Sequence, residues 1–136
     1  MIEKTEFLAN KINEFIEKYG EVPPHWIYKP DSHPYSIIWR YGSGDEFCDC
    51  FYIWFEENCQ TTEKRIAYFK KYNPPPRWLA SVVDSIWETE GWNEPFFDYT
   101  PYLKKLEKYG FTGTSEYEKD LDDQKWLDKE NDINRL

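Results

Sequence analysis

The chain has 136 residues, a formal net charge of -9 and an aromatic content of 20%. A chain of this length fits one domain, and it contains no apolar run of the roughly 18 residues that a membrane span requires. Nucleic-acid backbone binding is disfavoured, because acidic residues exceed basic ones in both halves of the sequence. We therefore expect a single globular domain over residues 1–136 that does not bind membranes. We expect it in the cytoplasm, because its first residues lack the features of a signal peptide.

The first predicted helix follows Thr5. Apolar residues recur at helical spacing from Leu8 to Tyr19 and form one stripe. Gly20 is typical of the residue that ends a helix in the left-handed conformation.

The next segment, residues 21–35, is predicted to be a packed loop. It contains four prolines, which exclude a regular helix, and it carries several aromatic residues. Residues 36–41 fit either a short strand or a helical turn, and we favour the turn.

A buried helix is predicted after the sequence Gly42-Ser43-Gly44. Asp45 is expected to cap its first turn, and apolar residues follow at helical spacing from Phe47 to Phe55. Thr61 or Thr62 is expected to cap the helix after it.

Three prolines at 74–76 break the chain before the clearest amphipathic helix, which runs from Trp78 to Trp87. Thr100 is predicted to cap a helix that ends at Gly110, with Tyr109 facing inward.

The last helix is predicted to start with a capping box made by Ser115 and Glu118. Its apolar residues Tyr117, Leu121 and Leu127 are expected to face inward. Its acids, including Asp120, Asp122 and Asp123, are interpreted as a solvated face. Together these patterns predict an all-α fold of five to six helices with aromatic- and proline-rich loops.

The segment from His33 to Glu46 has the features of a binding or catalytic loop. Arg40 could hold an anionic group while Asp45 or Glu46 acts as a base, and two glycines allow close approach of the backbone. The simpler interpretation is structural: Asp45 caps a helix and Arg40 pairs with one of the two acids.

Metal and thiol chemistry have little support. Cys48, Cys50 and Cys59 are expected to be free and mostly buried, and their spacing with His25 and His33 does not match a zinc site. The three aspartates of the last helix lack the glycine and glutamate of a calcium loop. A Cys–His nucleophile formed with His33 is disfavoured, so we expect no cofactor and no metal.

The aromatic residues divide into helical stripes and loops. The stripes fit a core, whereas loop aromatics beside acids fit either a binding surface or the ends of a helical bundle. The residues that we single out as candidates for a binding site lie in two regions: Trp26, Tyr28, His33, Tyr35, Trp39, Arg40, Asp45 and Glu46 in the first, and Trp92, Phe96, Phe97 and Tyr99 in the second.

The sequence favours an interaction protein over an enzyme. Aromatic anchors would supply affinity for a protein partner, and carboxylates would steer a basic one, as in inhibitor-like or immunity-like proteins. The alternatives are a small-molecule binder or enzyme that uses the His33–Glu46 segment, and a homodimer whose aromatic surface is the subunit interface.

Overall fold

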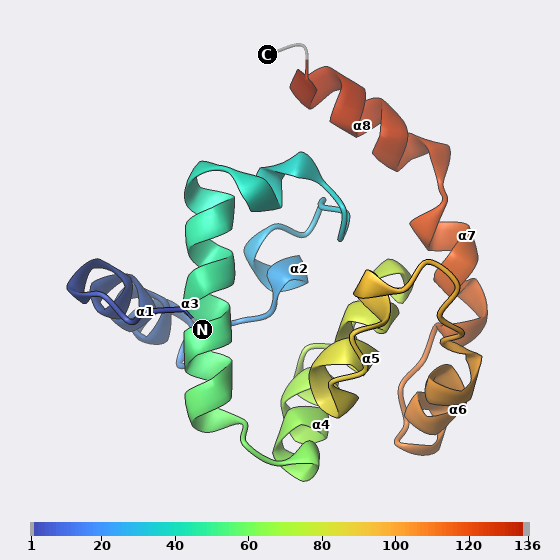
Figure 1. Cartoon of the computed structure of the whole chain (residues 1–136), viewed down its shortest axis with the longest axis horizontal. Coiled ribbons are helices and arrows are strands. Elements are labelled where there is room, and N and C mark those ends of the chain that lie inside the picture. The colour runs from blue at the N-terminus through green and yellow to red at the C-terminus, as the bar shows by residue number, and fades with distance from the viewer. Residues whose placement is uncertain (1, 135–136) are drawn as a thin grey trace.

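The computed structural model describes residues 2–134, without the side chains of residues 92 and 131–134. This part of the chain is helical and contains no strand, which confirms the all-α class (Figure 1). It has more helices than expected, because the proline-rich loop forms one short helix and the predicted last helix is divided in two. The α-helices are α1 (Glu6–Tyr19), α2 (His25–Tyr28), α3 (Gly42–Asn58), α4 (Thr62–Lys71), α5 (Leu79–Trp87), α6 (Thr100–Lys108), α7 (Tyr117–Leu121) and α8 (Gln124–Asn134).

Four short 3-10 helices lie between these α-helices: η1 (Ile37–Arg40), η2 (Pro76–Trp78), η3 (Gly91–Asn93) and η4 (Thr114–Glu116). In Figure 1, α1 crosses the long helix α3 on one side of the molecule, and α4 to α7 form the other side. Helix α8 extends from α7 along the upper edge of this view.

The ends of α1 are those predicted. The Thr5 hydroxyl accepts a hydrogen bond from the Leu8 N–H at 3.2 Å. Gly20 has φ 86° and donates its N–H to the Ile16 carbonyl. Both ends therefore depend on local chemistry that the sequence displays.

Helix α3 begins four residues earlier than predicted, at Gly42, so Asp45 is not its cap but an acid in its first turn. Residues 36–41 form the expected helical turn, η1, which starts where the Ser36 hydroxyl accepts from the Ile38 N–H. This turn packs against the start of α3. A Cβ atom on Gly44 would lie 1.9 Å from the Ile38 carbonyl oxygen, so the close approach requires glycine.

Thr61 caps α4, as one of the two predicted alternatives, by accepting from the Lys64 N–H. The cap predicted at Thr100 is wrong. Thr100 is the first residue of α6, and the Asp98 carboxylate accepts its N–H at 2.9 Å. Tyr109 is half exposed at the end of α6 and does not face inward.

The C-terminal region departs most from expectation. The capping box is wrong, because Ser115 lies within η4 and no side chain caps η4 or α7. Tyr117 is buried as predicted, whereas Leu127 is mostly exposed. The Asp123 carboxylate accepts the Lys125 N–H at 3.0 Å, and this local bond starts α8 as a separate helix.

The core is largely aromatic. The Tyr28 and Phe47 rings stack with centroids 4.3 Å apart, and Phe15 meets Phe47 edge to face at 5.4 Å. The buried tryptophans include Trp26, Trp39, Trp54 and Trp78, so many of the aromatic residues pack in the core. All three cysteines are free, as expected. None of the helices in residues 2–134 combines the length and the apolar composition that a membrane span requires.

Candidate binding groove

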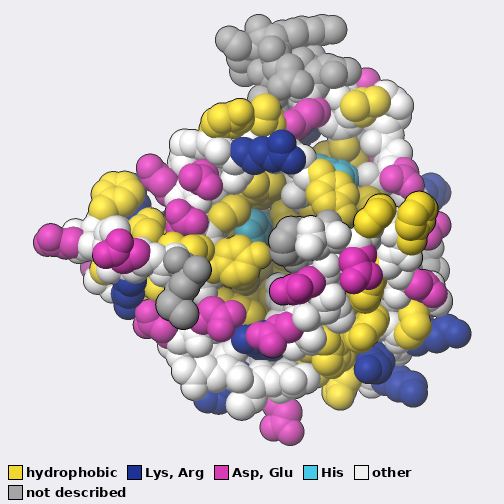
Figure 2. Space-filling model, in the orientation of Figure 1, with side chains coloured by type: hydrophobic (Ala, Val, Ile, Leu, Met, Phe, Trp, Pro, Cys, Tyr) yellow, Lys and Arg dark blue, Asp and Glu magenta, His cyan; other side chains and the backbone are white. Residues whose placement is uncertain are grey.

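A groove of about 1060 Å³ lies between α3 and α5. Helix α2 and η2 contribute to its floor, while η1 and α4 lie at its two ends. The space-filling view shows a hollow in the middle of this face, with hydrophobic side chains and a histidine inside it (Figure 2). Basic and acidic side chains lie around its edge.

His25 is at the centre of the groove floor. Its ring stacks on Trp78 at 5.4 Å and meets Trp39 and Phe51 edge to face at 4.9 and 5.0 Å. Its Nε2 atom lies 3.6 Å from the Cys48 sulfur. Helix α2 and the proline-rich loop thus bring a histidine against a cysteine of α3, a pairing that the sequence did not suggest.

Burial holds both members of this pair in their neutral forms. It lowers the pKa of His25 to about 3. Burial, together with the charges of Asp45 and Asp49, raises the pKa of the Cys48 thiol to about 12. A thiolate nucleophile requires the opposite shift, so the pair is a poor catalytic dyad at neutral pH.

The indole N–H of Trp78 has no hydrogen-bond partner. It is the one such atom among the buried side-chain nitrogens and oxygens of the described residues. The two neighbouring tryptophans of the floor differ, because Trp26 donates to the Tyr72 carbonyl at 3.0 Å and Trp39 to the His33 carbonyl at 2.9 Å. An unsatisfied buried donor costs about 1–3 kcal/mol, so it marks a place where a ligand oxygen would be stabilising.

The rim beside α5 is acidic and is built on a strained turn. Glu88 and Glu90 both line the groove and have φ of 53° and 54°, in the left-handed region that non-glycine residues rarely adopt. Strain of this kind persists only where surrounding contacts enforce it, and it is concentrated at functional sites.

Asp84 enforces this turn. Its carboxylate accepts hydrogen bonds from the Thr89 hydroxyl, from the Gly91 N–H at 3.3 Å and from the Tyr99 hydroxyl at 2.9 Å. Gly91 is required here, since a Cβ atom on it would lie 2.4 Å from the Tyr99 oxygen. These bonds fix the backbone that carries Glu88 and Glu90.

Tyrosines line the groove across from this turn. Tyr35 and Tyr52 are both more than half exposed, on the loop before η1 and on α3. Partial burial and the negative charge of Asp84 raise the pKa of each hydroxyl. The two tyrosines therefore stay protonated and can donate hydrogen bonds to an incoming group.

Arg65 closes the α4 end of the groove. It donates to the Cys59 carbonyl at 2.8 Å and the Ser85 carbonyl at 2.7 Å. It also pairs with Glu88 at 3.2 Å and with Glu56 at 3.7 Å. Its positive charge is therefore already matched within the protein, and Glu90 and Asp84 add negative charge to the same rim.

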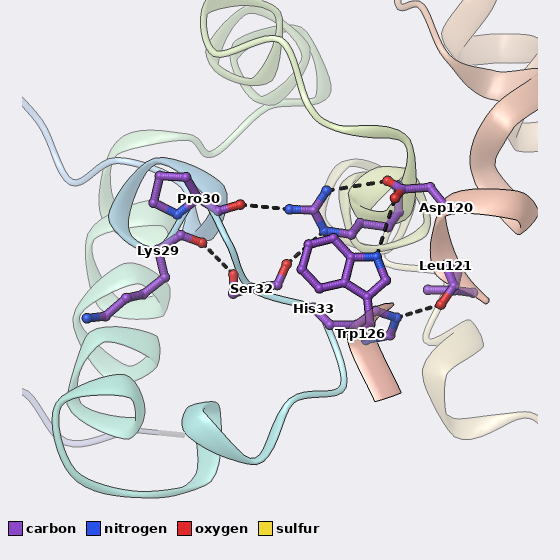
Figure 3. A network of polar contacts seen from close by, with 8 residues as sticks. Lys29, Pro30, Ser32, His33, Asp120, Leu121 and Trp126 are labelled. Carbon is purple, nitrogen blue, oxygen red and sulfur yellow. Dashed lines mark hydrogen bonds and ion pairs between the residues drawn. The ribbon is translucent and has the colours of Figure 1, made fainter. Parts of the chain in front are cut away.

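A second polar cluster joins the loop after α2 to η2, α7 and α8 and is centred on the buried Arg77. Figure 3 shows its labelled members, which include Pro30, Ser32, Asp120 and Trp126. Arg77 donates to the Ser32 and Pro30 carbonyls at 2.7 and 2.8 Å and pairs with Asp120 at 3.4 Å. Its guanidinium lies 4.1 Å from the centre of the Trp126 ring. The interpretation of Asp120 as part of a solvated face is therefore wrong: it joins α7 to the rest of the fold.

Helix α8 supports the loop that forms one end of the groove. The Glu130 carboxylate accepts from the Ser36 hydroxyl at 2.9 Å and from the Ile37 N–H at 2.7 Å. A cavity of about 260 Å³ remains between this loop and α8, and Tyr35 lines both this cavity and the groove.

Four of the residues that the sequence singled out line the groove: Trp26, Tyr35, Trp39 and Arg40. The others of the first region do not line it. Tyr28 stacks on Phe47, and Asp45 and Glu46 lie in the first turn of α3. His33 accepts the Tyr35 N–H through Nδ1 and therefore donates through Nε2 to the Leu121 carbonyl, at 2.8 Å.

The described members of the second predicted region, Phe96, Phe97 and Tyr99, do not line the groove either. Tyr99 supports the acidic turn through Asp84, Phe97 packs against Tyr99 at 4.7 Å, and Phe96 is almost fully exposed. The side chain of Trp92 lies outside the described residues.

Sequence reasoning missed His25 as a floor residue and also missed Tyr52, Trp78, Asp84, Glu88 and Glu90. Only Trp78 carried a signal, as an aromatic beside prolines. The described residues contain no group of three or more His, Cys, Asp or Glu side chains that could hold a metal ion.

No family model and no solved structure matches the chain. The chain is similar to the type-2 serine–tRNA ligase of Methanococcoides burtonii, with 27% identity over 153 aligned positions. The alignment includes 93% of this chain but 30% of the ligase, so the chain spans about a third of that protein's length.

Proposed function

We propose that the groove between α3 and α5 binds a basic segment of a protein partner, and that the protein is an interaction module. The observation that carries this proposal is the strained turn that holds Glu88 and Glu90 beside an aromatic-lined groove. A fold that maintains two left-handed glutamates at a groove edge has placed negative charge there at a cost in stability.

The aromatic lining and the acidic rim of the groove suit different side chains of such a partner. Aromatic side chains supply most of the affinity at interfaces, where they are fully desolvated. Carboxylates at the rim steer a positively charged partner and select against an acidic one. The net charge of -9 acts in the same direction at longer range.

Catalysis is less well supported by the same residues. A general base or nucleophile requires a pKa near the working pH, whereas His25 and Cys48 are shifted away from neutrality in opposite directions. The similarity to a serine–tRNA ligase does not carry ligase activity to a chain that spans about a third of the enzyme's length.

The test is binding of a lysine- and arginine-rich peptide, measured by calorimetry at low and high salt. Affinity should fall at least tenfold between about 0.05 M and about 0.5 M salt, because screening shortens the range of charge attraction to a few ångströms. Unchanged affinity across this range would remove the electrostatic part of the proposal.

Two matched pairs of variants locate the site. Tyr52 and Phe7 are both 53% exposed aromatics on helices, but only Tyr52 lines the groove. Tyr52→Ala should weaken binding about tenfold and Phe7→Ala should not. Glu90→Gln should weaken it by about two- to fivefold, whereas Glu17→Gln, on the exposed side of α1, should not. Equal effects within each pair would place the peptide outside the groove.

A further inference from the structure

The floor of the groove differs chemically from its rim, because it carries no formal charge. His25 and Cys48 are neutral there, and the remaining side chains around them are aromatic or aliphatic, including Phe51, Trp78 and Val82. A lysine or arginine tip placed on this floor would lose its hydration with no counter-charge in contact. The cations of a basic segment therefore belong at the rim, and an uncharged side chain belongs on the floor.

One of the residues that line the floor, Trp78, carries a hydrogen-bond donor that the protein does not use. Trp78 is 3% exposed and its indole N–H has no partner, while the equivalent groups of Trp26 and Trp39 donate to backbone carbonyls. Indole is a donor only, so the missing partner must be an acceptor. Lysine and arginine offer none, and a carboxylate would be repelled by Asp84 and Glu90.

We propose that this floor is a subsite for one tyrosine side chain, carried by the basic segment. The proposal rests on the function proposed for the groove and names the anchor that the partner inserts. The tyrosine ring packs on the aromatic side chains that surround His25 in the floor, and its phenolic oxygen accepts the hydrogen bond from the Trp78 N–H.

The Trp78 nitrogen is buried in the unbound protein, so neighbouring side chains must shift as the phenol enters. Rotamer changes of this size are common at interfaces whose backbone stays in place. The indole N–H of Trp78 should therefore report on the subsite directly.

The experiment compares three lysine-rich peptides that are identical except for one central residue, which is Tyr, Phe or Ala. We expect the Tyr peptide to bind about fivefold to tenfold more tightly than the Phe peptide, since one oxygen and its hydrogen bond distinguish them. The Ala peptide should bind most weakly. In Trp78→Phe the Tyr and Phe peptides should bind equally, whereas Trp87→Phe, outside the groove, should preserve the difference.

A second measurement does not depend on whether Trp78→Phe folds. In the ¹⁵N-labelled wild-type chain, p-cresol should move one indole N–H proton resonance downfield, and toluene, which has no oxygen, should not. The Trp78 resonance is assigned by its absence from the spectrum of Trp78→Phe, or by selective labelling if that variant is unfolded.

The outcomes separate the two proposals. Equal binding of the Tyr and Phe peptides, or an equal response to p-cresol and toluene, overturns the tyrosine subsite. If all three peptides bind equally and lose affinity with salt, the subsite is wrong and the basic-segment function stands. If none binds at low salt, the proposed function is wrong as well.

Discussion

Replacing Asp120 with asparagine should destabilise the protein far more than replacing Glu88 with glutamine, although each carboxylate pairs with a buried arginine. Arg77 and Arg65 have side chains that are both 8% exposed, so the two arginines are matched in burial. Their partners differ, because the Asp120 side chain is 17% exposed and that of Glu88 is 71% exposed.

The expected loss in the free energy of unfolding follows from this difference in exposure. Removing one member of a buried ion pair costs about 3–5 kcal/mol, because the other charge stays buried without compensation. Asp120→Asn keeps an oxygen that can still accept from the Arg77 N–H, so we place its cost at about 2–3 kcal/mol. Glu88 is mostly in solvent, where screening limits an ion pair to about 0–1 kcal/mol, and Glu88→Gln should cost no more than that.

Thermal and urea unfolding of both variants provide the assay. For a domain of this size, each kcal/mol corresponds to a fall of about 3–5 °C in Tm, so Asp120→Asn should unfold about 6–15 °C below the wild type. Glu88→Gln should lie within about 5 °C of it. Added salt should change the stability of the wild type and of Asp120→Asn in the same way, since the Arg77 pair is sheltered from ions. Equal losses in the two variants would refute the argument that exposure of the carboxylate decides the cost.

Three further predictions follow from individual groups. Glu90→Gly should raise the free energy of unfolding in urea by about 0.5 kcal/mol, because the relief of left-handed backbone strain slightly exceeds the entropy that glycine adds to the unfolded chain. The same variant should weaken peptide binding as Glu90→Gln does. A loss of stability would contradict the strain at this residue. Because the pKa of His25 is lowered, its imidazole is protonated near pH 6.5 in the unfolded chain but only near pH 3 in the folded chain. The free energy of unfolding should therefore fall as pH drops below 6.5, by up to about 1.4 kcal/mol per pH unit. This contribution to the pH dependence of stability should be absent from His25→Phe. Burial raises the pKa of Cys48 to about 12 and of Cys50 to about 11. At pH 8 a disulfide reagent should therefore react more slowly with the folded than with the urea-unfolded chain, by about 1000-fold at Cys48 and about 100-fold at Cys50. Rapid labelling of Cys48 would contradict its neutral state.

Helices whose ends depend on neighbouring residues were predictable from the sequence. Thr5 and Gly20 bound α1 through bonds within four residues, and Thr61 starts α4 in the same way. The start of α3 was misplaced because its position depends on contact with η1, where Gly44 meets the Ile38 carbonyl. The residues around Asp45 alone predict that it caps the helix, because they carry no sign of the contact between Gly44 and η1.

The candidate site was much less predictable, because it is assembled from distant segments. His25, Cys48, Trp78 and Glu90 come from four separate parts of the chain, and no short motif links them. The acidic turn carries no glycine at positions 88 or 90, so the sequence contains no sign of left-handed backbone there. Asp120 resembles its acidic neighbours in the sequence, and only the fold places it against Arg77.

The support that α7 and α8 give to the loop before η1 has a consequence for synthesis of the protein. Its hydrogen bonds join residues 88 to 94 positions apart, as in His33 with Leu121 and Ser36 with Glu130. While the ribosome is still adding residues before position 120, these bonds cannot form, and the end of the groove that carries Tyr35 and Arg40 lacks its brace. A nascent chain should therefore acquire its helices early and the final shape of its groove late, after residues 121 and 130 have been added.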